Sequence, residues 1–389
     1  MIYIHNASVW TMVGQDYENG CILIENGKIK AVGEQLQAPA GARVIDGQGG
    51  VVMPGMIDAH CHIGIFGEGT GFYLMDGNEN SNPSTPQMRA IDAVNPQDMA
   101  FREALEGGVT TVCTGPGSTN VIGGTFAILK TYGQSVEEMA LVKECAVKAA
   151  FGENPKRVYG AMKKEPYTRM GSAAIFRREM QRALEYRQSK RDTEAGLCQA
   201  PAYDFALENL VRVLDGELPL KIHAHRADDI CTAMRLVKEF GVNCTLDHCT
   251  EGYKIADQLK AFDAKVLVGP MILDRCKAEL AGSHTDNVVR IAEAGNRFCI
   301  VTDSPCVNVK HLFVQAGYAV SLGLDKIEAR KAITLYPAQL LGIDDRVGSI
   351  APGKDADLVL LTGDLFDMES KIKAVMVNGE VVYQNELLF

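Results

Sequence analysis

The chain has 389 residues, of which 47% are hydrophobic and 23% charged, and its formal net charge is −10. These proportions are typical of a globular protein with a sizeable core. The acidic balance argues against a nucleic acid or an anionic membrane surface as a partner. No stretch reaches the roughly 18 consecutive apolar residues of a membrane-spanning helix. The charge balance does not identify a substrate, because a local basic pocket can lie inside an acidic protein.

Eleven cysteines are scattered along the chain without a Cys-x-x-Cys pair. An odd, dispersed set of thiols is typical of reduced cysteines in the cytosol. The first residues show no basic region followed by a long apolar run, which a targeting signal would carry. We predict a cytoplasmic location.

Both ends of the chain carry short β-strand patterns. An Asn-Gly pair at 26–27 lies between two apolar runs, and a second pair at 378–379 lies between two more. Asn-Gly accepts the positive φ angles of a two-residue hairpin turn, so each pattern predicts a β-hairpin. We predict that segments 1–54 and 346–389 pair into one small β-sandwich domain.

Between residues 55 and 345, apolar strand patterns alternate with amphipathic helix patterns. This alternation predicts an α/β fold with a parallel sheet, and about eight strands predict a (β/α)8 TIM barrel. The link between the strands at 126–129 and 146–151 looks short for a crossover helix. A Gly-, Asn-, Ser- and Pro-rich loop at 63–94 is a candidate active-site cover, because structureless loops of this length are commonly functional.

His60 and His62 end the first barrel strand. Side chains alternate between the faces of a strand, so both rings project to one side and can hold a single divalent metal ion. The reacting groups of a barrel lie at the C-terminal ends of its strands. In chain order, those ends carry His60 and His62, Lys148, His223 and His225, His248, and Asp303. Five of the eight histidines fall there, which predicts a metal centre at the barrel mouth.

Four segments and a tail around these residues form a recognisable set. They are Pro-Gly-Met-Ile-Asp-Ala-His-Cys-His at 54–62, Lys-Ile-His-Ala-His at 221–225, Leu-Asp-His at 246–248, Val-Thr-Asp-Ser-Pro at 301–305 and the tail at 347–359. With them the chain resembles the amidohydrolase superfamily, and within it the imidazolonepropionase-like amidohydrolases. The resemblance covers nearly the whole chain and implies a barrel with a paired terminal sandwich. Similar proteins form dimers or larger assemblies, so a homo-oligomer is an open expectation.

The resemblance also implies the metal ligands. His60, His62 and Asp303 would hold a more buried ion, and His223 and His248 a second, more exposed one. Zinc suits these ligands, and manganese, iron or cobalt can occupy such sites.

Lys148 has a separate implied role. It resembles the lysine that CO2 carboxylates to a carbamate, which then bridges two divalent ions. Burial favours the unprotonated amine that this reaction needs. Lys143, Glu144 and Glu153 lie near enough in the sequence to compete for the same place.

The residues that contact substrate are less defined. His225 faces the same way as His223, so either ring can be the ligand; the resemblance favours His223 and leaves His225 to contact substrate. Arg226 stands where an imidazolonepropionase is expected to carry an acidic residue, which argues against that ring-opening activity. Arg226, Arg169 and Tyr159 are candidates to bind a substrate carboxylate, although Arg226 also fits a solvent-exposed arginine at a helix start.

The resulting hypothesis is a metal-dependent hydrolase that cleaves an amide-type C–N bond in a dipeptide, an N-acyl amino acid or a cyclic amide. The ions lower the pKa of a bound water to give hydroxide, while Asp303 accepts its proton and passes it to the leaving nitrogen. His225 would help polarise the carbonyl oxygen.

Two alternatives remain. An aminohydrolase would deaminate a heterocycle with one ion and a glutamate soon after His225; no glutamate stands there, and Asp228 and Asp229 are the nearest acids. A non-catalytic scaffold would lack several ligands, whereas every proposed ligand is present.

Overall fold

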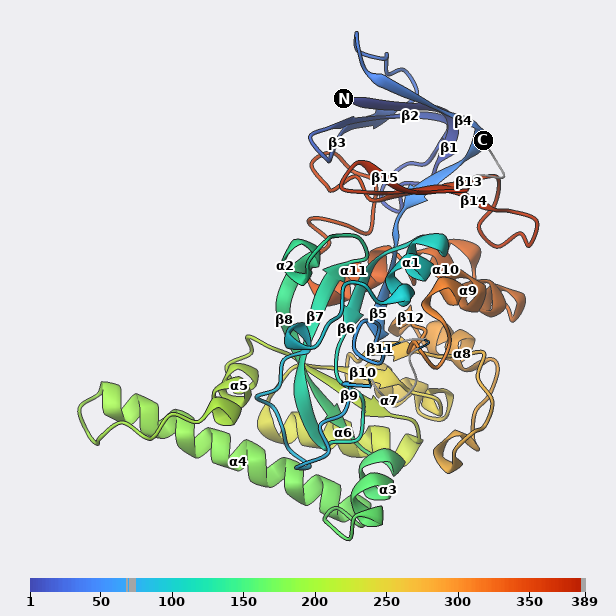
Figure 1. Cartoon of the computed structure of the whole chain (residues 1–389). Coiled ribbons are helices and arrows are strands. Elements are labelled where there is room, and N and C mark those ends of the chain that lie inside the picture. The colour runs from blue at the N-terminus through green and yellow to red at the C-terminus, as the bar shows by residue number, and fades with distance from the viewer. Residues whose placement is uncertain (68, 70–74, 386–389) are drawn as a thin grey trace.

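The computed structural model describes residues 1–67, 69 and 75–385. Figure 1 shows a β-sandwich built from both chain ends above a barrel with its helices. The strands of these described residues form one seven-stranded and one eight-stranded sheet. The expected α/β barrel with a separate terminal sheet is confirmed.

The strands of the sandwich belong to one hydrogen-bonded sheet, to which both ends of the chain contribute. The strand order is β15-β14-β13-β4-β1-β2-β3. Its strands are β1 (Ile2–Val9), β2 (Tyr17–Glu25), β3 (Lys28–Gly33), β4 (Arg43–Pro54), β13 (Leu358–Leu361), β14 (Ile372–Val377) and β15 (Glu380–Gln384). The two ends join where β4 and β13 pair antiparallel, with Val52 opposite Leu360.

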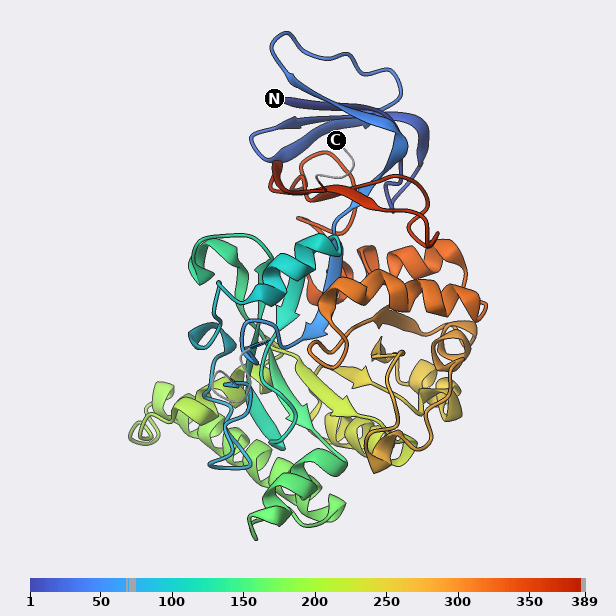
Figure 2. The same ribbon diagram turned by 45° about the vertical axis from the view of Figure 1, so that its right-hand side comes forward.

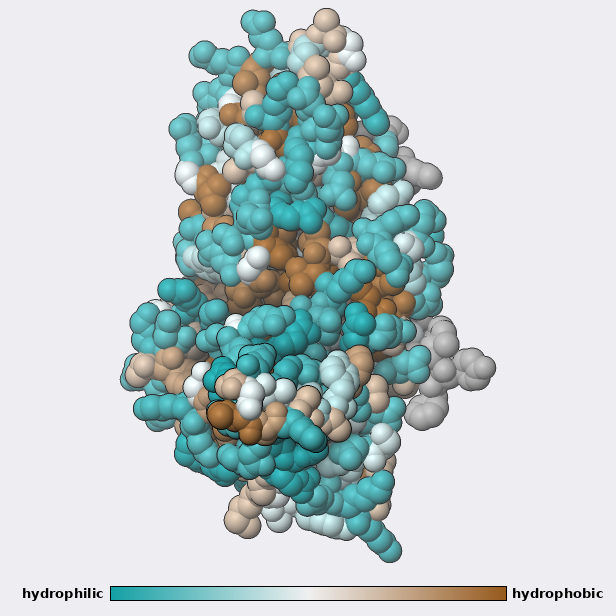
Figure 3. All heavy atoms as spheres, turned by 90° about the vertical axis from the view of Figure 1, so that its left-hand side faces the viewer, coloured by the Kyte–Doolittle hydropathy of each residue, from teal (hydrophilic) through white to brown (hydrophobic). Residues whose placement is uncertain are grey.

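Alternation of side chains along these strands makes two apolar contacts. Val52 and Leu360 belong to the cluster inside the sandwich. Their neighbours Val51, Met53 and Leu361 belong instead to the large cluster of the barrel. One face of the strand pair therefore fills the sandwich and the other packs on the barrel, as a period of two requires. Figure 3 shows a band of apolar side chains at this level of the molecule.

The barrel sheet has the order β12-β11-β10-β9-β8-β7-β6-β5. Its strands are β5 (Met56–Cys61), β6 (Val109–Thr114), β7 (Ile122–Lys130), β8 (Ala140–Ala150), β9 (Leu220–Ala224), β10 (Cys244–His248), β11 (Lys265–Val268) and β12 (Arg297–Ile300). The segment after β12 meets β5, where the Asp303 amide donates to the His60 carbonyl at 3.2 Å and the His62 amide to the Ser304 carbonyl at 2.8 Å. These bonds bring the first and last strands together.

The helices cover the outside of the barrel (Figure 2). They are α1 (Met99–Glu106), α2 (Val136–Met139), α3 (Glu153–Ala161), α4 (Arg169–Glu194), α5 (Phe205–Leu214), α6 (Ala227–Phe240), α7 (Ala256–Ala261), α8 (Asn287–Glu293), α9 (Leu312–Ser321), α10 (Lys326–Lys331) and α11 (Leu335–Leu341). Short 3-10 turns lie at η2 (Ala90–Asp92), η3 (Gly252–Lys254), η4 (Ala278–Leu280) and η5 (Val309–His311). Within the described chain, no helix has the length and apolar character to cross a membrane.

One barrel strand corrects the expectation of a wholly parallel sheet. Strand β7 pairs antiparallel with both β6 and β8. The links at 115–121 and 131–139 are shorter than the dozen or so residues that a parallel crossover needs, so two hairpins form instead.

Part of the loop at 63–94, which we expect to cover the site, pairs with strand β7. Its part at 84–89 pairs in parallel with β7 through the bridges Ser84–Ile122 and Arg89–Thr125. The loop is thus held against a hairpin that has no crossover helix. A covering role for the loop stays a prediction, and residues 68 and 70–74 of it lie outside the described residues.

A buried ion cluster connects the barrel to the sandwich. Lys130, at the end of β7, is 2% exposed and forms ion pairs with Asp357 and, at 3.1 Å, with Asp355. Burial raises the pKa of Asp357 despite the neighbouring ammonium. Asp355 also pairs with Lys28 and Arg346, so Lys130 is one of three cations around it.

We expect Lys130→Met to lower the free energy of unfolding by about 3–5 kcal/mol, because it leaves a buried carboxylate without its cation. Lys28→Met is the matched control, since Lys28 is half exposed and Asp355 keeps Arg346; its cost should stay below about 1 kcal/mol. Urea unfolding measures both. Equal effects of the two substitutions would contradict this account of the interface.

Candidate metal centre

The candidate ligands gather at one end of the barrel. Because β5 starts directly after the sandwich strand β4, its C-terminal end, with His60 and His62, points away from the sandwich. His248 ends β10, and Asp303 follows β12. His248 and Asp303 have φ angles of 74° and 53°, which few residues other than glycine adopt. Such strain commonly marks functional sites.

His60, His62 and Asp303 form the first donor group. Asp303 Oδ1 lies 3.1 Å from His62 Nε2 and 3.5 Å from His60 Nε2. Lys148 is fully buried on β8, and its Nζ lies 3.5 Å from His60 Nε2. His60 is also the neighbour of the second donor group, because its ring centroid lies 5.1 Å from that of His248. Lys148 therefore lies close to both groups.

His223, His225 and His248 form the second donor group, with their ligand atoms all within 4.8 Å of one another. Their ring centroids lie 4.6–4.8 Å apart. His248 Nε2 is buried and has no hydrogen-bond partner among the described residues. A buried nitrogen lone pair without a partner is costly unless a cation binds it.

The other ring nitrogens of four histidines fix how the rings point. The Nδ1 contacts are His60 to Asp247 Oδ2 at 2.8 Å, His62 to the Gly115 carbonyl at 2.7 Å, His248 to the Gly269 carbonyl at 2.8 Å and His225 to Thr250 Oγ at 2.7 Å. Partners of this kind are what metal-binding histidines use to hold the tautomer with Nε2 free.

These distances fit divalent ions. Two donors that each lie 2.0–2.1 Å from one tetrahedral ion are about 3.4 Å apart. The distances from Asp303 Oδ1 to His62 and His60, 3.1 and 3.5 Å, match this edge. Together with the unpartnered His248 Nε2, the two groups support a binuclear divalent metal centre.

Burial sets the protonation states that metal binding needs. It lowers the pKa of His60 to about 4 and holds those of His223 and His225 well below the usual value, so these rings are neutral at pH 7. Burial works against ionisation of Asp303, but the surrounding histidines outweigh it and hold its pKa well below the usual value. For Lys148, burial lowers the pKa to about 8, which leaves a fraction of free amine.

The competitors for the place of Lys148 point elsewhere. Lys143 is exposed on β8, and Glu144 pairs with Arg212 at 3.3 Å. Glu153, at the start of α3, accepts a hydrogen bond from the Glu279 amide at 3.0 Å.

The three predicted substrate contacts do not join the histidines. Tyr159 is buried on α3, and its hydroxyl donates to the Asn82 carbonyl at 2.8 Å and to Asn120 Oδ1 at 2.6 Å. Arg226 forms a fork with Asp228 at 3.0 and 3.1 Å, and Arg169 pairs with the same carboxylate. Their roles, like those of the ligands, stay predictions.

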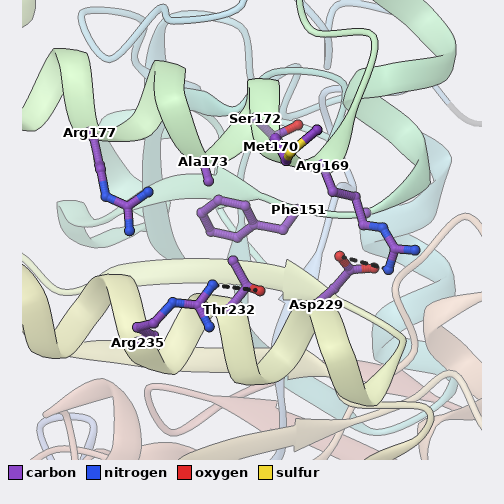
Figure 4. A pocket seen from close by; sticks show the side chains of 10 residues that line it. Phe151, Arg169, Met170, Ser172, Ala173, Arg177, Asp229, Thr232 and Arg235 are labelled. Carbon is purple, nitrogen blue, oxygen red and sulfur yellow. Dashed lines mark hydrogen bonds and ion pairs between the residues drawn. The ribbon is translucent and has the colours of Figure 1, made fainter.

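Arg169 borders a cavity of about 250 Å³ between α4 and α6 (Figure 4). Asp229 lies at the same end of it, 3.8 Å from Arg169, and Phe151 forms part of the wall. Burial raises the pKa of Asp229 to about 6. The cavity lies beside the barrel mouth, because Phe151 follows the strand that carries Lys148.

Sequence reasoning assigned no role to several buried charges. Asp247 lies between His60 and Lys221, whose Nζ is 3.5 Å from it and donates to the Ala59 carbonyl at 3.0 Å. Asp58 binds the Thr302 hydroxyl across the closing strands. Asp247 directly precedes His248 in the sequence, and Asp58 lies two residues before His60. Their places next to candidate ligands were the signal that could have revealed them. Glu279, 3.5 Å from His223, stands in no motif.

The chain is similar to known amidohydrolases and to a deaminase. An amidohydrolase crystal structure from Thermotoga maritima superposes with a TM-score of 0.96 and 39% identity, covering 99% of this chain and 100% of that one. The amidohydrolase tasK of Hapsidospora irregularis is 27% identical over 99% of this chain, which spans only 43% of that protein. A 5-methylthioadenosine/S-adenosylhomocysteine deaminase of Symbiobacterium thermophilum is 25% identical, with 99% of this chain and 94% of the deaminase covered.

A model of the amidohydrolase family matches residues 51–382, a range that contains every candidate ligand. The match covers most of the chain and every strand of the barrel. The chain belongs to the amidohydrolase family.

Proposed function

We propose that the chain is a binuclear metal-dependent hydrolase of amide-type C–N bonds. The observation that carries this proposal is the pair of buried donor groups on either side of one barrel mouth, each with the spacing of metal ligands. His60, His62 and Asp303 would hold one ion, and His223 and His248 the other, with a carboxylated Lys148 between them. Bound divalent ions would supply an acidified water and polarise the carbonyl oxygen of the substrate.

Asp303 would move the proton in this reaction. Its carboxylate is ionised, and its side chain is 15% exposed. The side chains of His60 and His62, the other members of its donor group, are more deeply buried. It can accept a proton from the attacking water and deliver it to the leaving nitrogen. His225, whose Nδ1 is held by Thr250, would present Nε2 towards the second group and the carbonyl oxygen of the substrate.

The substrates we propose are dipeptides, N-acyl amino acids and cyclic amides. Arg169 and Arg226 both pair with Asp228, which a substrate carboxylate would replace, and the cavity of Figure 4 offers room beside Arg169. Imidazolonepropionase-like amidohydrolases are the subgroup we favour, with zinc as the first metal to test.

Deamination of a heterocycle is the second candidate. The similarity to a deaminase over nearly the full length of both chains favours it. Asp229 is a buried acid whose pKa of about 6 would suit proton transfer near neutral pH. One ion in place of two would distinguish this chemistry.

We expect two divalent ions per chain by elemental analysis after expression with sufficient metal, and loss of activity on dialysis against a chelator. One ion per chain would favour the deaminase, and none would favour a scaffold without catalysis. Zinc, manganese, iron and cobalt are each added back to the apoprotein to identify the active metal.

Asp303→Asn should lower kcat by about 10²–10⁴-fold on the best substrate found in a screen of dipeptides, N-acyl amino acids and cyclic amides, because an amide cannot accept the proton. Circular dichroism checks that the variant is folded. A variant that keeps nearly full activity would rule out Asp303 as the base.

Carboxylation of Lys148 predicts that apoprotein reconstituted with metal in bicarbonate-containing buffer recovers more activity than apoprotein reconstituted without it. Lys148→Ala should lose this dependence and regain part of the activity with a short added carboxylate, which can stand in for the carbamate. Bicarbonate-independent recovery of the native chain would contradict a bridging carbamate.

A further inference from the structure

Glu279 is a buried carboxylate at the barrel mouth to which none of the roles above applies. It lies on the 3-10 turn η4, in the loop between β11 and α8, and is 3% exposed. Its Oε1 is 3.5 Å from His223 Nε2 and 3.6 Å from His225 Nε2. A carboxylate so deeply buried needs a cation or several donors to offset the loss of water.

The backbone holds this side chain in place by its other oxygen. The Glu153 amide donates to Glu279 Oε2 at 2.9 Å, and the Glu279 amide donates back to Glu153 Oε2 at 3.0 Å. Gly152 has a φ of 98°, and a Cβ there would lie 2.7 Å from Glu279 Oε2. The close approach therefore needs glycine, and it leaves Oε1 directed at the two histidines.

We propose that Glu279 Oε1 is a ligand of the second metal ion, together with His223 and His248. The distance of 3.5 Å from Oε1 to His223 Nε2 is close to the edge of about 3.4 Å that a tetrahedral ion sets between its donors. Two neutral imidazoles and one carboxylate would then face the dication. This inference rests on the metal centre of the proposed function, and it adds a donor from a loop to donors from strand ends.

Lys277 provides the competing explanation. Its Nζ lies 2.7 Å from Glu279 Oε1, so the carboxylate has an ammonium partner. Lys277 is 21% exposed, however, and its long side chain can turn to solvent. A dication attracts the carboxylate more strongly than a single positive charge does. On our proposal the ammonium therefore competes with the metal for Oε1.

The test compares Glu279→Gln with Lys277→Met in apoprotein titrated with cobalt. Glutamine keeps the shape but loses the anionic donor, so we expect the affinity for the more weakly bound ion to fall at least about 10-fold, with a change in the visible cobalt spectrum. Lys277→Met should leave this affinity unchanged or raise it. Chelator competition measures both ions in each variant.

Three results would overturn the proposal. Glu279→Gln could bind both ions as the native chain does, with the same spectrum. Both variants could weaken binding equally, which would make Glu279 a partner of Lys277 only. The native chain could bind fewer than two ions, in which case the proposed centre itself fails. Should Glu279→Gln not fold, Glu279→Asp takes its place, with a shifted spectrum supporting ligation and an unchanged one opposing it.

Discussion

The structure depends on burying five imidazoles at one end of a barrel. Burial lowers the pKa of four of them, His60, His223, His225 and His248, and contacts such as Asp247 with His60 and the Gly269 carbonyl with His248 orient these two rings with Nε2 inward. His248 Nε2 then has no hydrogen-bond partner among the described residues. This arrangement is unfavourable without a cation and favourable with one, so the fold and the metal centre are coupled.

The barrel supplies rigidity around this centre in an unusual way. Strand β7 joins β6 and β8 through hairpins, so the sheet carries two antiparallel pairs beside its parallel ones. A loop segment at 84–89, bridged to β7, lies where crossover helices would otherwise pack. Lys130, at the end of the same strand, ties the barrel to Asp355 and Asp357 of the sandwich. A strand that departs from the parallel pattern thus contributes to both domains.

Much of this could be predicted, because the signals were local. Asn-Gly turns marked the sandwich hairpins, and His60 and His62 marked the mouth through the alternation of a strand. The direction of β7 could not be read from its apolar residues, since an apolar run carries no direction; only the short link hinted at it. Glu279 was missed because its position depends on a long loop folding back over His223.

Anomalous X-ray diffraction from crystals grown with zinc tests the central claim most directly. The account predicts two anomalous peaks about 3.5–4 Å apart, one among His60, His62 and Asp303 and the other among His223, His225 and His248, with Lys148 between them. A single peak confined to one donor group, or peaks outside both groups, would contradict a binuclear hydrolase.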